Sequence, residues 1–182
     1  MTETTQTTAH TTEASAVSLD DLRVRRAIEL VYREADLLDR KEYEAWQNLY
    51  ADDAFYVIPI ERDAEDFDDI LNMVYDDKRL QAMRVVRMTE GHAIAAVDSA
   101  VTVRTVSRFV VTGVDGLTAG ALVSLRAAQV LVAFKRGTHD LWAADVDYRI
   151  RLGATRHDDQ IVRKVIRLVD ADAATPAAGF LL

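Results

Sequence analysis

The chain has 182 residues, 49% of them apolar and 29% charged, which suits one globular domain with a sizeable core. Its net charge of −8 argues against nucleic acid as a partner, because a phosphate backbone requires a basic binding face. No apolar run approaches the roughly 18 residues of a membrane span, and the first residues lack the apolar core of a signal peptide. We therefore expect a soluble, cytoplasmic protein without membrane contact, and the absence of cysteine fits that compartment.

The absence of cysteine also limits metal chemistry. An iron–sulfur centre needs thiolate ligands, and a Rieske centre still needs two cysteines. The four histidines lie in different segments and show no ligand spacing: His10, His92, His139 and His157. The seven glycines form neither a phosphate-binding loop nor a dinucleotide fingerprint. We expect no metal site and no cofactor site in this chain.

The N-terminal part predicts a tail and a long helix. Residues 1–17 are rich in threonine and other small residues, which predicts a disordered tail; residues 18–182 are expected to form a single domain. Ser18 or Asp20 can cap the helix, because their side-chain oxygens accept from the first free N–H groups. Helical spacing predicts an apolar face made by Ile28, Val31, Tyr32, Ala35 and Leu38. The predicted polar face carries Glu29, Arg33, Glu34 and Arg40.

The next segments predict shorter elements. A second helix carries Tyr43, Trp46, Leu49 and Tyr50, and residues 51–53 interrupt its pattern. Residues 55–58 then predict a strand that Pro59 closes, because proline cannot donate to a ladder. Residues 61–69 form a dense acidic stretch, which is read as a solvated loop; a docking patch for a basic partner is the alternative.

A third helix and four strands complete the chain. Residues 70–74 predict a short extended segment, and Asp76 or Asp77 can cap a helix that ends at Gly91. The apolar residues of this helix are Leu80, Met83, Val86 and Met88. Apolar and polar residues alternate most clearly over 142–152, and strands are also predicted over 101–114, 119–136 and 161–169. Short turns between them predict an antiparallel meander. The expected class is α+β: a long N-terminal helix and shorter helices packed in a strongly curved, mainly antiparallel sheet, forming a cone.

Short motifs follow one another along the chain in a characteristic order. They are Tyr32-Arg33-Glu34-Ala35, Leu37-Leu38-Asp39, Tyr43, Trp46, Leu49, Asp53, Tyr56, Pro59, Tyr75-Asp76-Asp77, Leu80, Arg84, Arg87, Thr89, Gly91, Val106-Ser107, Leu168-Val169-Asp170-Ala171-Asp172 and Phe180-Leu181-Leu182. From about Val24 onward, this order resembles the small (β) subunit of aromatic-ring-hydroxylating dioxygenases, Rieske non-haem iron oxygenases whose β subunit is NTF2-like (SnoaL-like). Two positions depart from the family pattern: Val101 stands where an arginine is common, and Arg108 where an asparagine is common.

The resemblance implies a non-catalytic, structural role. The β subunit of this family stabilises an α3β3 terminal oxygenase that dihydroxylates an aromatic compound. The resemblance places the Rieske 2Fe-2S cluster and the mononuclear iron in the α (large) subunit. It also implies that this chain forms a homotrimer and contacts the α subunit directly. A reductase or ferredoxin is then an indirect partner, which supplies electrons to the oxygenase.

The alternative is a stand-alone NTF2-like enzyme, such as a dehydratase, isomerase or cyclase, that uses acid–base chemistry in the cone pocket. The groups that could supply this chemistry are His92, Asp36, Asp39, Tyr32, Tyr50 and Tyr56. Tyrosines at helical spacing are more often core residues, and Asp39 falls near a predicted helix end. The apolar residues 177–182 are expected to be buried, either in the chain's own cone or on a neighbouring subunit.

Overall fold

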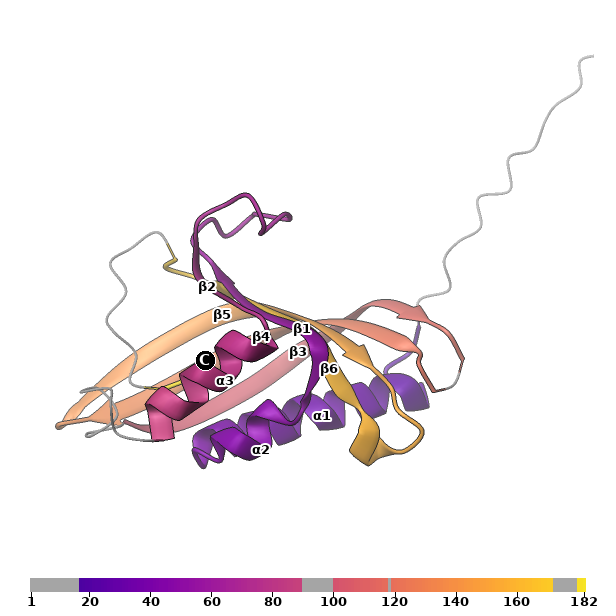
Figure 1. Cartoon of the computed structure of the whole chain (residues 1–182), viewed down its shortest axis with the longest axis horizontal. Helices are drawn as coiled ribbons and strands as arrows, with labels where there is room; N and C mark the ends of the chain where they lie inside the picture. The colour runs from indigo at the N-terminus through magenta and orange to yellow at the C-terminus, as the bar shows by residue number, and fades with distance from the viewer. Residues whose placement is uncertain (1–16, 90–99, 118, 172–179) are drawn as a thin grey trace, which may run out of the picture.

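A six-stranded curved sheet and a long helix make up most of the described structure (Figure 1). The computed structural model describes residues 17–89, 100–117, 119–171 and 180–182. The strand order is β2-β1-β6-β5-β4-β3, and helix α1 (Leu22–Asp39) packs on β3 and β4. The core lies between α1 and the sheet face turned toward it, called the inner face below. The α+β class with a strongly curved, mainly antiparallel sheet is confirmed.

Helix α1 is rotated and capped differently from the prediction. Its cap is Asp21, whose carboxylate accepts from the Arg23 backbone N–H at 2.8 Å, whereas Ser18 and Asp20 do not cap it. The Arg23 side chain also pairs with Asp21 at 2.6 Å, and a charged partner strengthens this choice of cap. The buried face comprises Val24, Ala27, Leu30, Val31, Glu34, Leu37 and Leu38. The predicted faces were therefore wrong at Tyr32, which is exposed, and at Glu34, which is buried.

The second helix is shorter, and the first strand longer, than predicted. Helix α2 (Tyr43–Gln47) ends before Tyr50, and β1 (Tyr50–Pro59) begins there. Residues 51–53 therefore extend the strand instead of interrupting a helix. The reason is long-range: β1 pairs in parallel with β6 from Tyr50 opposite Ile161, and the Ile161 N–H donates to the Leu49 carbonyl at 2.8 Å. Tertiary pairing of this kind overrides the local preference of aspartate against strands.

Helix α3 turns a different face to the core than its apolar residues predict. It spans Lys78–Thr89 after strand β2 (Asn72–Asp76), and Asp77 accepts from the Leu80 N–H at 2.7 Å, which confirms Asp77 as the cap. Gln81 and Val85 are buried, whereas Met83 and Val86 are exposed. An ion pair from Arg84 to the buried Asp76, 2.5 Å long, sets this rotation. The predicted end at Gly91 lies outside the described residues.

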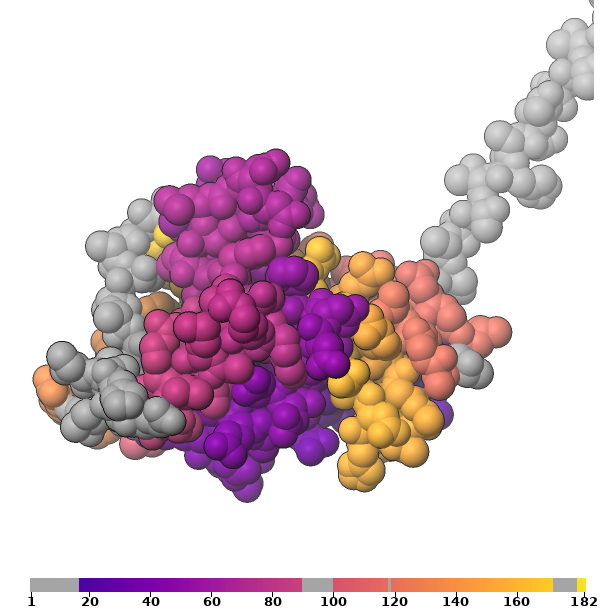
Figure 2. All heavy atoms as spheres, viewed as in Figure 1, coloured from indigo at the N-terminus to yellow at the C-terminus, as the bar shows by residue number. Residues whose placement is uncertain are grey.

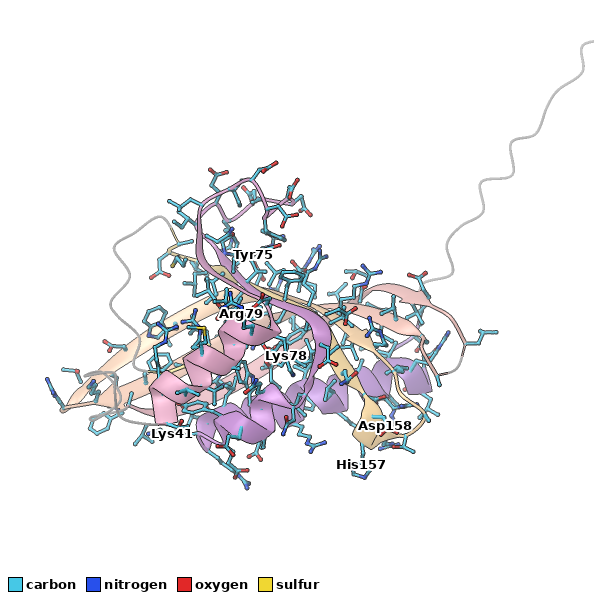
Figure 3. The ribbon with its side chains drawn as sticks, in the orientation of Figure 1. Lys41, Tyr75, Lys78, Arg79, His157 and Asp158 are labelled. Atoms are coloured by element: carbon cyan, nitrogen blue, oxygen red, sulfur yellow. The ribbon has the colours of Figure 1, made fainter. Side chains whose placement is uncertain are left out.

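Lysine 78 ties the start of α3 to the end of α2 (Figure 3). Its Nζ donates to the carbonyl of Gln47 at 2.6 Å and to that of Tyr50 at 2.7 Å. These are carbonyls near a helix end and a strand start, which need donors when they are partly buried. Partial burial lowers the pKa of Lys78 from its usual value, and Asp52 nearby opposes that shift. The contact fixes α3 against β1.

The C-terminal half forms the predicted meander. Strands β3 (Val101–Asp115), β4 (Leu122–Lys135), β5 (Thr138–Arg151) and β6 (Gln160–Leu168) pair antiparallel in that order. A short 3-10 helix, η1 (Arg156–Asp158), lies between β5 and β6. The sequence pattern indicated neither the parallel pairing of β1 with β6 nor the antiparallel pairing of β1 with β2. The pairing of β1 with β6 closes the two halves of the chain into one sheet.

The first and last described segments of the chain both contact the core. Val17 packs against the core, and the rest of the predicted tail, including His10, lies outside the described residues. Phe180, Leu181 and Leu182 are buried inside the chain's own cone, and the Phe180 ring meets Trp142 edge-on at 5.7 Å. The expected burial of the apolar ending is confirmed for residues 180–182, and residues 177–179 lie outside the described part of the chain. Of the two locations considered, the structure shows the intramolecular one.

Deleting residues 180–182 should lower the melting temperature by several degrees, and by no more than about 10–35 °C. The three side chains contribute roughly 1.5–3 kcal/mol each as an upper bound, and each lost kcal/mol shifts a domain of this size by about 2–4 °C. Differential scanning calorimetry measures the shift. Leu71→Ala is the control, because Leu71 is 75% exposed and its truncation should leave the melting temperature unchanged. An unchanged melting temperature in the deletion variant would contradict the docking.

Candidate functional site

The inside of the cone holds a buried polar cluster centred on Glu34, called the Glu34 cluster below. The Glu34 side chain is 1% exposed and accepts four hydrogen bonds from side chains of α2, β1, β5 and β6. The donors are Trp46 Nε1 at 3.1 Å, Tyr50 Oη at 2.6 Å, Lys164 Nζ at 3.0 Å and Tyr148 Oη at 3.1 Å. A carboxylate removed from water needs such partners, and this one has them.

Strand register explains why these donors converge. Tyr148 and Lys164 are directly opposite each other on β5 and β6, and both side chains point to the inner face. Lys164 shares that face with Ile166 and Leu168, which follow it at a period of two. Trp46 comes from the one apolar turn of α2, and Tyr50 opens β1. Packing of α1 on the sheet then brings Glu34 to the centre.

Burial and charge determine the protonation of the cluster. Burial lowers the pKa of Lys164, and the Glu34 carboxylate opposes that lowering. Burial raises the pKa of Tyr50 and of Tyr148 well above the usual value, and the negative charge of Glu34 raises both further. Burial raises the pKa of Tyr56 in the same way. The three phenols are therefore neutral donors at ordinary pH and cannot act as bases.

The C-terminal segment occupies the rest of the cone. The main-chain oxygen of Leu182 accepts from Tyr56 Oη at 2.8 Å and from Lys164 Nζ at 3.1 Å. The Leu181 carbonyl accepts from Arg104 Nη2 at 3.0 Å. Three donors that line the interior thus bind the chain's own backbone. Phe180, Leu181 and Leu182 pack there as part of the hydrophobic core.

Asp39 joins the end of α1 to β3. Its carboxylate accepts from Thr102 Oγ1, from the Arg104 backbone N–H and from Arg104 Nε, each at 2.9 Å. Arg104 is buried and its Nη1 has no partner in the described part of the chain. The geometry is that of a helix end anchored to a strand.

The structure brings together only some of the six residues named for acid–base chemistry. Tyr50 and Tyr56 lie inside the cone, and Asp39 lies on its wall. Asp36 is exposed and pairs with Arg40 at 3.0 Å, while Tyr32 is exposed and meets Phe109 edge-on at 5.6 Å. His92 lies outside the described residues. His139 and His157 are both exposed, and Figure 3 shows His157 on the η1 turn.

Sequence reasoning missed the acceptor and the cation of the cluster. Glu34 was assigned to the polar face, although it follows Ala27 and Val31 at helical spacing on the face that is buried. Lys164 was not singled out, although it shares the period of Ile166 and Leu168. Tyr148 and Trp46 are core residues, and their polar ends also donate to Glu34. The signal that could have found both residues was a charged side chain at a core position, Glu34 on α1 and Lys164 on β6.

The comparisons with known proteins agree with this fold. Residues 33–172 match the family described as "Ring hydroxylating beta subunit". The chain belongs to the ring-hydroxylating β-subunit family. This match covers most of the chain, and it confirms the resemblance drawn from the ordered motifs. No curated protein matches the chain at the sequence level.

Three solved structures share the fold. The β subunit of benzoate 1,2-dioxygenase from Burkholderia mallei has a TM-score of 0.65 at 20% identity, covering 91% of this chain and all of that chain. Naphthalene 1,2-dioxygenase has a TM-score of 0.68 at 17% identity, covering 87% and 84%. An NTF2-like protein with a cystatin-like fold from Novosphingobium aromaticivorans has a TM-score of 0.52 at 18% identity, covering 88% and 96%. The NTF2-like fold is confirmed.

The described residues of this β subunit contain no group of three or more histidine, aspartate or glutamate side chains that could hold a metal ion. Among the same residues, no helix is both long and apolar enough to cross a membrane.

Replacing Lys164 with methionine should destabilise the fold by roughly 3–5 kcal/mol, because Glu34 would remain as a buried charge without its cation. Glu34→Gln combined with Lys164→Met removes both charges and should recover part of that loss. Urea unfolding of the two variants and the parent protein measures the difference. A double variant less stable than Lys164→Met alone would contradict the assignment of the pair as an isolated buried ion pair.

The tyrosines predict a loss of stability at alkaline pH. The pKa of each tyrosine is higher in the folded protein than in the unfolded chain, where it is about 10. Their contribution to the free energy of unfolding is therefore complete below about pH 10. It is lost above that pH, by up to about 1.4 kcal/mol per pH unit for each tyrosine. Lys164 has the opposite sign, since its folded pKa is lowered, but it is one group against three. The urea midpoint should therefore fall between pH 10 and pH 11.5.

Ultraviolet titration gives the second readout for these tyrosines. Tyr50, Tyr56 and Tyr148 should ionise together with the loss of the circular dichroism signal. Ionisation of all three in a protein that keeps its native spectrum would contradict their burial.

Proposed function

We propose that this chain is the non-catalytic, structural β subunit of a multicomponent aromatic-ring-hydroxylating dioxygenase. In this role it stabilises an α3β3 terminal oxygenase that dihydroxylates an aromatic compound. The observation that carries the proposal is the burial of residues 180–182 inside the cone, where their main-chain oxygens accept hydrogen bonds from Tyr56, Lys164 and Arg104. Membership of the β-subunit family supports the same role.

The hydrogen bonding of the cone interior argues for a structural role. An acid–base catalyst must reach a proton of the substrate, at hydrogen-bond distance. Both oxygens of Glu34 are engaged by protein donors, and Lys164 and Tyr56 donate to the Leu182 main-chain oxygen. These groups come from α1, β1, β5 and β6. The three strands are paired in one sheet, and α1 packs on that sheet. Such a network stabilises a scaffold and leaves no group of the cluster facing solvent.

The outer face of the sheet carries an apolar patch that fits a subunit contact. It spans three neighbouring strands, where Val101 lies opposite Phe134, Val103 opposite Val132, and Val132 opposite Leu141. The members of the apolar patch are 39–68% exposed and comprise Val101, Val103, Val130, Val132, Phe134 and Leu141. A contiguous exposed patch of this kind marks a protein interface. We assign it to contact with the α subunit.

The proposal includes the rest of the assembly. The α subunit would carry the Rieske 2Fe-2S cluster and the mononuclear iron, and a reductase or ferredoxin would supply electrons to it. This chain would form a homotrimer beneath the α subunits, in the cytoplasm, and its lack of cysteine fits that compartment. The cofactor chemistry belongs to the partner, and this chain contributes the surfaces that hold the partner in place.

Co-expression with a Rieske-type large subunit tests the proposal. The two chains should co-elute in equimolar amounts, and the iron should follow the large subunit. Val132→Asp places a charge in the apolar patch and should weaken the association at least about tenfold, since burying an unpaired charge costs more than 1.4 kcal/mol. Val86→Asp is the matched control, because Val86 is an exposed valine on α3.

The stand-alone enzyme makes the opposite prediction. An isolated chain that turns over a small molecule and never joins a large subunit would overturn the proposed function. Normal association of Val132→Asp would leave the function standing and remove the apolar patch from the interface.

A further inference from the structure

Two arginines face each other on the outer face of the sheet without a counter-charge. Arg149 on β5 and Arg163 on β6 are directly opposite residues in the ladder, and both are exposed. In the described part of the chain neither side chain forms an ion pair or a hydrogen bond. Like charges opposite each other destabilise a strand pair. The monomer therefore carries an unfavourable interaction that carboxylates from a partner would relieve.

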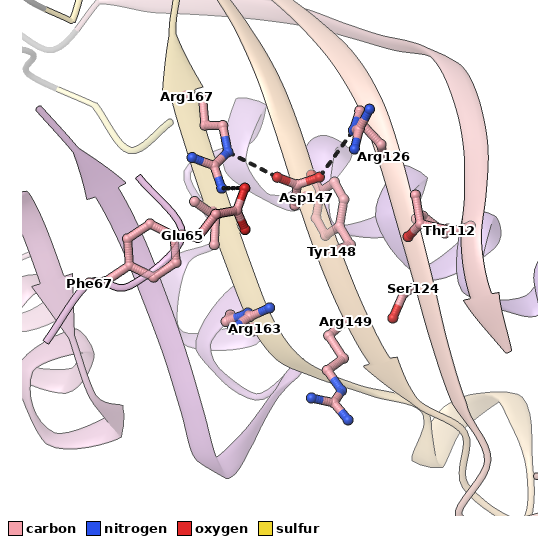
Figure 4. Close-up of a pocket in the computed structure, with 12 residues that line it drawn as sticks. Glu65, Phe67, Thr112, Ser124, Arg126, Asp147, Tyr148, Arg149, Arg163 and Arg167 are labelled. Atoms are coloured by element: carbon pink, nitrogen blue, oxygen red, sulfur yellow. Dashed lines mark hydrogen bonds and ion pairs between the residues drawn. The ribbon is translucent and has the colours of Figure 1, made fainter. Parts of the chain in front are cut away.

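The neighbouring arginines differ, because each has a carboxylate (Figure 4). Arg167 and Arg126 both pair with Asp147, at 3.0 and 3.5 Å, and Arg167 also lies 3.9 Å from Glu65. Figure 4 shows these pairs joined by dashed lines and none at Arg149 or Arg163. Within this part of the sheet, the positive charge without a paired carboxylate is thus confined to Arg149 and Arg163, which lie in one row across β5 and β6.

The two arginines line a hollow of about 250 Å³. Four arginines and two carboxylates line it, a net charge of +2 on a protein whose total is −8. Ser124 is opposite Arg149 on β4, and its hydroxyl lies in the same row. We call this hollow the arginine groove. Its chemistry selects carboxylates, which arginine binds in bidentate geometry.

Aromatic rings border the arginine groove on its other side. Phe55 is opposite Arg163 on β1 and is 36% exposed. Its ring stacks on Tyr75 of β2, with centroids 5.2 Å apart and planes inclined by 29°. Arginine beside exposed aromatic rings is the composition of interface hot spots. The groove and the ring pair together fit a polypeptide better than a free inorganic anion.

The chain itself carries a segment of matching chemistry. Six of the nine residues from 61 to 69 are acidic: Glu61, Asp63, Glu65, Asp66, Asp68 and Asp69. Phe67 is buried against Val57 and Val165 and anchors this acidic loop to its own sheet. Asp66 and Asp69 are exposed, and no ion pair of either occurs within the described residues. Figure 2 shows the segment that follows β1 as a knob that stands out from the body of the molecule.

We propose that, in the homotrimer, the acidic loop of one copy docks into the arginine groove of the next copy. This inference rests on the proposed function, which supplies the trimer. A cyclic ring needs a heterologous interface made of two different, complementary patches on each subunit. The arginine groove and the acidic loop are such a pair. Within one chain, Phe67 and Glu65 hold the loop at the groove's edge, and its free carboxylates do not reach Arg149 or Arg163.

Charge reversal of the groove tests the docking. Arg149→Glu with Arg163→Glu should raise the dissociation constant of the trimer about 100-fold, because two attractive pairs become repulsive. Analytical ultracentrifugation, with and without the co-expressed large subunit, measures it. Added salt should weaken the parent trimer by screening these exposed charges. Arg25→Glu with Arg33→Glu is the matched control, since it changes the net charge equally on the exposed surface of α1.

A charge swap gives the decisive arm. By itself, the variant Asp66→Lys with Asp69→Lys should disrupt the trimer. Combining these two changes with the reversed groove should restore assembly. Circular dichroism must show that each variant is folded. A reversed groove that still forms the parent trimer, or a combined variant that stays dissociated, would overturn the inference. So would loss of large-subunit binding with the trimer intact, because the groove would then serve that partner.

The outcome for the parent protein separates the two hypotheses. A parent chain that neither trimerises nor joins the large subunit would refute the proposed function. A parent trimer that is indifferent to the charges of the groove refutes only the docking.

Discussion

The buried pair of Glu34 and Lys164 is the constraint on which the rest of this structure depends. An ion pair removed from water is tolerated only when further hydrogen bonds satisfy both partners. The Glu34 cluster around this pair holds α1, α2, β1, β5 and β6 together, because each element supplies one of the side chains of the cluster. The orientation of α1 in the cone follows from where Glu34 must lie. Such a pair specifies an arrangement more than it adds stability.

The same pair organises the C-terminal segment. Lys164 has donors to spare after meeting Glu34, and it donates to the Leu182 main-chain oxygen together with Tyr56. Arg104 adds a contact to Leu181 and is itself held by Asp39. The interior is consequently closed by polar contacts at its centre and by Phe180, Leu181 and Leu182 around them. Within the described residues, the C-terminal segment is therefore part of the core of the cone.

The outer face of the sheet divides into zones of different chemistry. Valines, a leucine and a phenylalanine cover one end of β3, β4 and β5, whereas arginines and carboxylates cover the rows further along β5 and β6. Only the segment anchored by Phe67 covers part of this face within the described structure. A sheet with a closed interior and a differentiated outer face is suited to contacts with other subunits. The surface properties and the packed interior both support the proposed role.

The sequence by itself determined the α+β class, the meander and the family. Those depend on periodicity and on ordered motifs, such as the alternation over residues 142–152, which are local properties of the chain. Tertiary structure alone decided the rotation of α1 and α3, the parallel pairing of β1 with β6, and the Glu34 cluster. Glu34 looks like a surface residue because helical periodicity weighs polarity, and a buried carboxylate is stable only once distant partners satisfy it. The opposition of Arg149 and Arg163 likewise required the register of β5 and β6, because a shift of one residue would have separated the two charges onto different faces.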